Sequence, residues 1–135
     1  MRVTVRLAKN EDGPRISELL AMVGLKTEGW DIDWNDIEPW WIVAELDGVV
    51  KGAVQICPSK PIARVEFLAV DPEMNEMDRG RVISNLERQW KATVKISGAG
   101  GFAGMIPYEY DSYLNVARRR GYVSIGEGHH MVKRV

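Results

Sequence analysis

Apolar positions along the chain switch between the two-residue period of strands and the longer period of helices. Residues 2–8 alternate and predict a first strand. The next apolar side chains recur every three or four positions, as on one face of a helix: Ile16, Leu19, Leu20 and Val23. We expect that helix to have Asp12 as its N-cap residue and to end at Gly24.

The middle of the chain predicts three strands and a long helix. The runs 41–45 and 49–57 are rich in β-forming residues and surround an Asp-Gly pair, which is typical of a hairpin. Residues 63–70 are largely apolar on both faces, so we expect a central strand. A helix is then predicted from about Gly80 to Ile96, because apolar residues recur at helical spacing: Ile83, Leu86, Trp90 and Val94.

The last third predicts a short strand, a helix and a closing hairpin. The strand is expected at 102–106, and the helix runs from Asp111 to a stop at Gly121. Residues 122–125 and 130–134 would form the hairpin. Hairpins mixed with crossovers indicate an α+β fold in one domain spanning 1–135. We expect a mixed, mostly antiparallel sheet of six to seven strands flanked by helices.

Composition narrows the class of protein. A net charge of −1 argues against a nucleic-acid-binding surface. No apolar run reaches membrane-spanning length, and the N-terminus lacks the apolar core of a signal peptide. Cys57 is the sole cysteine, which excludes an intrachain disulfide, and no Cys/His spacing suggests a metal site. We therefore expect a cytoplasmic protein without a metal.

A tryptophan cluster lies in the least regular part of the chain, residues 25–40. It consists of Trp30, Trp34 and Trp40, interleaved with acidic residues. One interpretation is an aromatic, acidic cage for a cationic amine acceptor. The other is core packing combined with a hydrophobic partner surface. Both interpretations stay open at this point.

Three short motifs follow one another in a fixed order. They are Val-Ala-Glu-Leu-Asp-Gly at 43–48, Leu-Ala-Val-Asp-Pro at 68–72, and Arg-Gly-Tyr at 120–122. In this order the chain resembles the GNAT superfamily of N-acetyltransferases over nearly its whole length. The resemblance implies acetyl-CoA as cofactor, bound where two parallel strands diverge. It places the thioester and the pantetheine arm along Leu68, Ala69 and Val70, with the Val70 N–H as oxyanion donor.

The same resemblance places the pyrophosphate on the loop after this strand. The family motif, Gln/Arg-x-x-Gly-x-Gly/Ala, falls on residues 75–80, where Gly80 alone keeps the pattern. Asp78 replaces a glycine and brings a negative charge. Two like unit charges 4 Å apart repel by about 1 kcal/mol in water and about 4 kcal/mol at a protein surface. Arg79 and Arg81 could pair with the phosphates, or they are solvated charges at the helix start.

Acetyl transfer to an amine needs a base and an acid. Glu66 is the candidate base; its expected strand face also carries Arg64 and Leu68, and an ion pair with Arg64 is the alternative interpretation. The position of the family acid falls on Ala117, which has no proton to donate. Tyr113, one helical turn earlier, is the candidate replacement, with Tyr108 and Tyr110 just before that helix.

Two functions from different classes follow. The first is an acetyl-CoA-dependent N-acetyltransferase acting on a small-molecule or protein amine. The second is a catalytically inactive GNAT-fold subunit that binds protein partners or its own copies, for example a bacteriophage virion component. Asn75, Asp78 and Ala117 favour the second, because each departs from the pattern that the family uses for catalysis.

Overall fold

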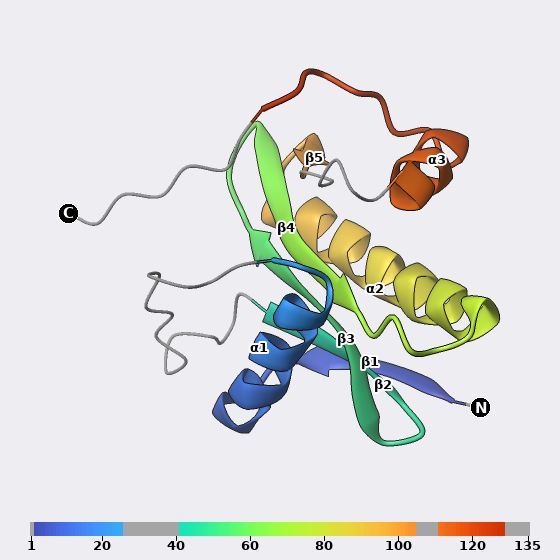
Figure 1. Ribbon diagram of the computed structural model, residues 1–135. Helices are drawn as coiled ribbons and strands as arrows, with labels where there is room; N and C mark the ends of the chain where they lie inside the picture. The colour runs from blue at the N-terminus through green and yellow to red at the C-terminus, as the bar shows by residue number, and fades with distance from the viewer. Residues whose placement is uncertain (1, 26–40, 105–110, 129–135) are drawn as a thin grey trace. The chain divides into compact units, whose positions relative to one another are not determined.

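The computed structural model describes residues 2–25, 41–104 and 111–128. The chain divides into two compact units, Met1–Gly104 and Met105–Val135. Among these described residues, the first unit contains the sheet and two long helices, and the second contains one helix (Figure 1).

The sheet of the first unit has five strands, which lie in the order of the sequence. Four of them form an antiparallel meander, and the short fifth strand pairs in parallel with the fourth. The strands are β1 (Val3–Leu7), β2 (Trp41–Leu46), β3 (Val49–Cys57), β4 (Ile62–Val70) and β5 (Gly101–Ala103). The predicted mixed, mostly antiparallel sheet is confirmed, with five strands in the described residues instead of six to seven.

The hairpin between β2 and β3 follows from its Asp-Gly pair. Asp47 and Gly48 both have positive φ, 52° and 84°. A type I′ turn requires this conformation at both central residues, and its twist matches that of the flanking strands. The predicted hairpin is therefore confirmed.

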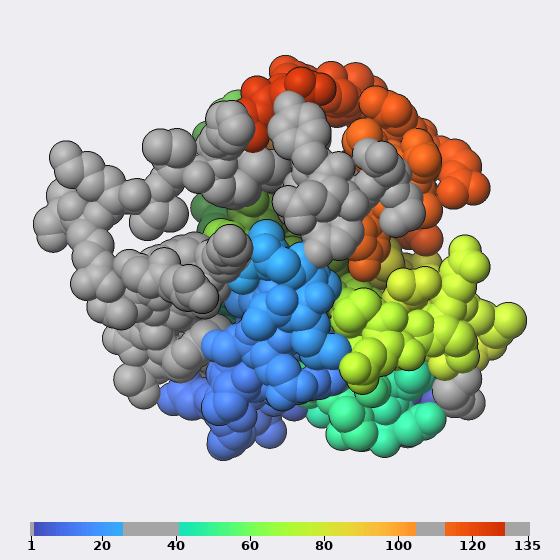
Figure 2. Space-filling view, viewed as in Figure 1, coloured from blue at the N-terminus to red at the C-terminus, as the bar shows by residue number. Residues whose placement is uncertain are grey.

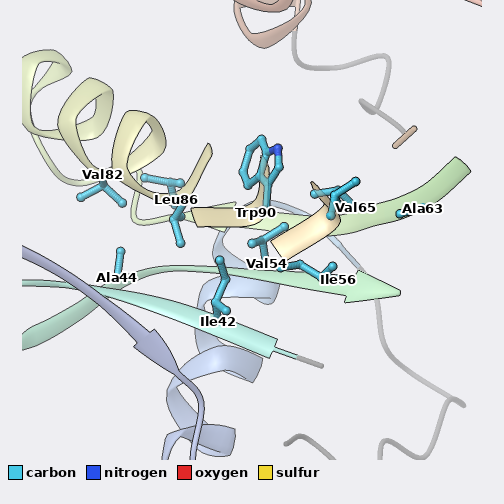
Figure 3. Packing of buried hydrophobic residues seen from close by; sticks show 11 residues of the cluster. Ile42, Ala44, Val54, Ile56, Ala63, Val65, Val82, Leu86 and Trp90 are labelled. Atoms are coloured by element: carbon cyan, nitrogen blue, oxygen red, sulfur yellow. The ribbon is translucent and has the colours of Figure 1, made fainter. Parts of the chain in front are cut away.

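Two helices, α1 (Gly13–Met22) and α2 (Glu76–Ser97), cover opposite faces of the sheet (Figure 1). The apolar stripe of α2 packs on side chains such as Ile42, Val54 and Val65 (Figure 3). Val43 and Ala53 alternate with these residues along their strands and are fully buried, so they face α1. α1 buries Ile16, Leu19 and Leu20, three of the four predicted positions, to within 1% of full burial.

The N-cap of α1 is the predicted residue, whereas α2 begins earlier than predicted. Asp12 is the N-cap of α1, but its carboxylate caps no helical N–H and instead binds the Arg6 guanidinium. α2 begins at Glu76, four residues before the predicted Gly80, because Asn75 accepts a hydrogen bond from the Asp78 N–H and caps the helix there.

A register shift interrupts β4. Ala69 pairs with Ala53, and Glu66 pairs with Gln55, so Phe67 and Leu68 together oppose one residue of β3. Such a bulge puts two successive side chains on one face. Phe67, at φ 56°, lies on the Glu66 side, whereas Leu68 packs against the core under α2. The prediction that Leu68 shares a face with Glu66 is wrong for this reason.

β4 also differs from its predicted place in the sheet. It is an interior strand, as its apolar faces indicate, but β3 is the middle strand of the five. The apolar stripe of α2 is shifted as well: Val82 is fully buried, whereas the predicted Ile83 is only partly buried.

The second unit contains α3 (Asp111–Arg119). Gly121 ends this helix at φ 91°, with Tyr122 N–H donating to the Ala117 carbonyl and Gly121 N–H to that of Arg118. These two bonds form a Schellman motif, as the glycine predicts. The predicted strand 122–125 is wrong, since residues 122–128 have no regular structure. The expected strand 130–134 and residues 105–106 of the expected strand 102–106 lie outside the described residues.

Gly104 and Gly80 give a matched test of this packing. A Cβ on Gly104 would lie 2.2 Å from the Val65 carbonyl oxygen, whereas one on Gly80 would meet nothing within 4 Å. We expect Gly104→Ala to lower the free energy of unfolding by roughly 2 kcal/mol, the usual effect of overpacking. Gly80→Ala should raise it by up to about 1 kcal/mol through helix propensity. Urea denaturation measures both, and equal effects would contradict the close approach at Gly104.

Candidate functional site

The feature that organises the site is the point where β4 and β5 part. β5 pairs only with the first residues of β4, from Ile62↔Gly101 to Arg64↔Ala103. The close approach of Gly104 to the Val65 carbonyl comes directly after this pairing. In the part of the chain that the structure describes, no strand pairs with the β5 side of residues 66–70. The backbone of β4 therefore has an open edge there.

Val70 presents its backbone groups to this edge. Asp71 N–H donates to the Lys51 carbonyl at 2.8 Å, so these two residues form a hydrogen-bonded pair between β3 and the end of β4. Such pairs alternate in antiparallel sheets, which turns the N–H and C=O of Val70 away from Gly52 and toward the open edge. Val70 can thus donate to an extended ligand beside β4, as the family resemblance implies.

Glu66 is the buried carboxylate beside this edge. It is 6% exposed and forms an ion pair with Arg64, whose side chain is 57% exposed. The ion pair of Glu66 with Arg64 is therefore confirmed. A role of Glu66 as a base stays a prediction. Arg64 fixes the orientation of the Glu66 carboxylate while keeping part of its own surface open to solvent.

Cys57 pairs with Arg64 across β3 and β4 and is half-buried. Burial raises the pKa of the Cys57 thiol, and the negative charge of Glu66 adds to this effect more than Arg64 offsets it. A nucleophilic cysteine needs the opposite shift, because the thiolate is the reactive form. Cys57 is therefore an apolar neighbour of Glu66 and has no sign of activation.

An aromatic pair lies on the same face as Glu66. The rings of Trp41 and Phe67 are stacked, with centroids 6.3 Å apart and planes at 22°. Trp41 is 5% exposed and is paired with Gln55, the β3 neighbour of Glu66. The bulge in β4 is what brings Phe67 to this face, and positive φ at so bulky a residue is uncommon. Sequence reasoning missed Phe67 because no local pattern signals the bulge.

A buried ionic network holds the loop between β4 and α2. The Asp71 carboxylate is 2% exposed and binds Arg15 at 3.0 Å, Lys51 at 3.2 Å and the Glu73 N–H at 2.9 Å. Burial pushes the pKa of Asp71 up, but these three donors outweigh burial and leave it below its ordinary value. The segments that this network joins are α1, the start of β3 and the loop leading into α2. They lie against one another on the surface shown in Figure 2.

The first turn of α2 occupies the position expected for the pyrophosphate. Asn75 and Asp78 bind each other through both a backbone and a side-chain contact, at 2.8 Å and 3.1 Å. Gly80 lies in the second turn, inside the helix instead of in a loop. Arg81 is exposed, with Nη1 4.0 Å from Asp78 Oδ1, and Arg79 is half-buried. The open edge of β4 fits a pantetheine arm, whereas this turn does not fit a phosphate cradle.

Other candidate residues fall outside this unit or outside the described residues. Tyr113 lies on α3 in the second unit and is half-buried. Trp30, Trp34 and Trp40 lie outside the described residues, so their role stays a prediction. No group of His, Cys, Asp or Glu in the described ranges could hold a metal ion. None of the helices described is long and apolar enough to cross a membrane.

A small pocket exists on the other face of the sheet, under α2. Val5, Ile42 and Thr93 are among its lining residues, and its volume is about 120 Å³. Ligand pockets usually exceed about 300 Å³. Because Glu66 faces the α1 side, this pocket is separate from the site described above.

The Asp71 network gives a test of how the loop is held. Asp71→Asn should lower the free energy of unfolding at pH 7 by about 2 kcal/mol, because charge-assisted bonds to a buried carboxylate are lost. The lowered pKa of Asp71 means that its stabilisation is complete above about pH 4 and fades as pH falls further. The difference between wild type and variant should therefore shrink from pH 6 to pH 3 in urea denaturation.

Glu18→Gln is the matched control for that experiment. Glu18 binds the same Arg15, but its side chain is 62% exposed. An exposed pair contributes less than about 1 kcal/mol. A loss as large as that of Asp71→Asn would contradict the assignment of the stabilisation to the buried carboxylate.

Comparisons with known proteins add to this geometry. No protein-family model matches the sequence, and no curated protein is significantly similar to it. Solved structures do match over nearly the whole chain. A transcriptional regulator from Bacillus halodurans has 15% identity and a TM-score of 0.72, and the match covers 98% of this chain and 100% of that one.

Two further solved structures extend the likeness. Ard1 from Thermoplasma volcanium is 17% identical with a TM-score of 0.68, covering 91% of this chain and 84% of its own. The aminoglycoside N-acetyltransferase AAC(6′)-Iy in complex with CoA is 16% identical with a TM-score of 0.63, covering 99% and 96%. At such low identity the likeness concerns the fold alone. The expected resemblance is confirmed at that level: this chain has the fold of the GNAT acetyltransferases.

Proposed function

We propose that this protein transfers an acetyl group from acetyl-CoA to an amine. The observation that carries the proposal is the open backbone edge of β4 at residues 66–70, with the buried carboxylate of Glu66 at its start. The edge provides donors and acceptors for an extended amide arm. The carboxylate provides a proton acceptor beside it. The GNAT fold and a CoA complex among the structural relatives support the same reaction.

Four residues of β4 have separate roles in the proposed reaction. Leu68, Ala69 and Val70 would hold the pantetheine arm along the backbone, and the Val70 N–H would bind the carbonyl oxygen on which negative charge develops. Glu66 would accept the proton of the acceptor ammonium, so that the neutral amine can attack. When bound, the thioester supplies an activated acetyl group, whose transfer forms a C–N bond and breaks the C–S bond.

Arg64 acts in this proposal as a positioning residue. Its guanidinium binds the Glu66 carboxylate and holds it on the α1-facing side of β4. Tyr113 stays the predicted acid of this reaction, since Ala117 has no proton to donate. The proton that Glu66 accepts leaves through solvent, and the second proton that the nitrogen loses as the amide forms replaces the one given to the thiolate. The overall reaction yields an amide, a free thiol and one released proton.

The acceptor is proposed to be a small-molecule or protein amine. An aminoglycoside N-acetyltransferase is one of the structural relatives, which supports an amine acceptor in general and no particular one. Trp30, Trp34 and Trp40 are proposed as the acceptor or partner surface. Use of acetyl-CoA together with one unpaired cysteine is consistent with a cytoplasmic protein.

A second candidate is a GNAT-fold subunit without catalysis, which would bind protein partners or its own copies. The specific observation in its favour is the pair formed by Asn75 and Asp78, which fills the position expected for the pyrophosphate. None of the structural relatives named above is a virion or structural protein, so the phage example has no support from them.

Calorimetry with acetyl-CoA separates the two candidates. We expect binding with a dissociation constant in the micromolar to millimolar range. Absence of binding at millimolar acetyl-CoA would overturn the proposed transferase activity and favour the second candidate, the non-catalytic subunit. Desulfo-CoA serves as a second ligand, because it lacks the thioester and cannot be turned over during the titration.

Glu66→Gln tests the proposed base. The amide keeps the size of the side chain but accepts no proton at neutral pH, so acetyl transfer to a primary amine should slow by about 100-fold or more. Affinity for desulfo-CoA should stay the same. Glu45→Gln is the matched control, since Glu45 is also a strand carboxylate paired with an arginine, at 2.9 Å from Arg6. An unchanged rate for Glu66→Gln would remove this residue from the mechanism.

A further inference from the structure

The N-terminus of α2 is closed by its own side chains. Asn75 Oδ1 accepts from the Asp78 N–H at 2.8 Å, and Asn75 Nδ2 donates to Asp78 Oδ2 at 3.1 Å. The Arg79 N–H donates to the Asn75 carbonyl at 3.0 Å. An anion at a helix N-terminus normally binds the free N–H groups of the first turn. One of the free N–H groups that would serve a phosphate here, that of Asp78, already has a side-chain partner, and the Arg79 N–H makes the first regular bond of the helix.

The anion that this terminus holds is the carboxylate of Asp78. The residue is 7% exposed, and its Oδ1 has no hydrogen-bond partner in the described part of the chain. The nearest cation, Arg81 Nη1, is 4.0 Å away. Negative charge is favourable at this end of a helix, so the macrodipole stabilises Asp78 where it would otherwise stabilise a phosphate. Glu76 adds a second acidic side chain to the same turn.

The open edge of β4 does not depend on the closure, by which we mean the contacts between Asn75 and Asp78. Val70 is turned toward the edge by the pairing of β3 with β4, and the Asp71 network holds the start of the following loop. Neither contact involves Asn75 or Asp78. The two halves of a CoA molecule would therefore meet different surroundings on this chain. The pantetheine arm would lie along the open edge of β4, whereas the pyrophosphate would meet a helix N-terminus that the Asp78 carboxylate occupies.

We infer that this protein recognises its acyl donor through the pantetheine arm alone and that the nucleotide phosphates contribute nothing to affinity. The inference rests on the proposed function, because it concerns the donor of that reaction. It identifies the substrate class as pantetheine thioesters, with or without an attached nucleotide.

Calorimetry with three probes tests the inference on the wild-type protein. Acetyl-CoA and acetyl-pantetheine should bind with dissociation constants within about threefold of each other, and ADP should not bind at millimolar concentration. If acetyl-CoA binds more than about tenfold more tightly than acetyl-pantetheine, the phosphates are recognised and the inference is overturned while the proposed function stands. If neither thioester binds, the proposed function fails and the inference fails with it.

Amide resonances of the labelled protein give a second readout that needs no turnover. Addition of acetyl-CoA should shift the Val70 amide and leave that of Asp78 in place. A shift of both, together with a response of Asp78 to ADP, would show that phosphate reaches the helix N-terminus.

Variants at the closure complete the test. Asp78→Asn removes the charge with little change in size, and Asn75→Gly with Asp78→Gly removes the whole closure. The double variant should bind acetyl-CoA about tenfold more tightly than wild type, with acetyl-pantetheine unchanged, and Asp78→Asn should move in the same direction by a smaller factor. Glu76→Gln, which removes an acid outside the closure, should change either affinity by less than about threefold. Thermal melting verifies that each variant is folded, and a folded Asp78→Asn with unchanged or weaker acetyl-CoA affinity overturns the inference.

Discussion

The constraint on which the site depends is the extra residue in β4. Without the bulge, strict alternation would turn Phe67 under α2 and leave Leu68 beside Glu66. With it, Glu66 and Phe67 share one face, Leu68 joins the core, and Val70 still pairs in register with Gly52. The carboxylate, the aromatic pair and the open backbone edge therefore come together because one strand is a residue longer than its partner requires.

Sequence patterns predicted those parts of the fold whose causes are local. The hairpin at Asp47 and Gly48, the buried face of α1 and the stop at Gly121 each depend on a few neighbouring residues. The start of α2 differs from the prediction because Asn75, which the family motif assigns to a phosphate loop, caps the helix; Asn followed by an acid three residues later is also a helix-capping signal. Val123 and Ile125 have the alternation of a strand, but a strand needs a partner that no single-segment pattern contains.

The site was predicted less completely than the fold. Glu66 could be named from its place in an apolar strand, and its pairing with Arg64 from their spacing. The Phe67 ring could not, since its position depends on a backbone conformation that bulky residues seldom adopt. The open edge of β4 results from the end of β5 at Ala103, more than thirty residues away in the sequence. Long-range relations of this kind are set by the sheet as a whole.

Gly80 determines how the first turn of α2 is joined to the rest of the helix. It lies in the second turn, where no neighbouring atom requires a glycine and where glycine weakens a helix. Beyond it, Leu86, Trp90 and Val94 clamp the helix to the sheet. The first turn is therefore joined to the rest of α2 through the residue with the lowest helix propensity, and the contacts between Asn75 and Asp78 hold its start. Loss of those two contacts would leave the packing of Leu86, Trp90 and Val94 on the sheet unchanged.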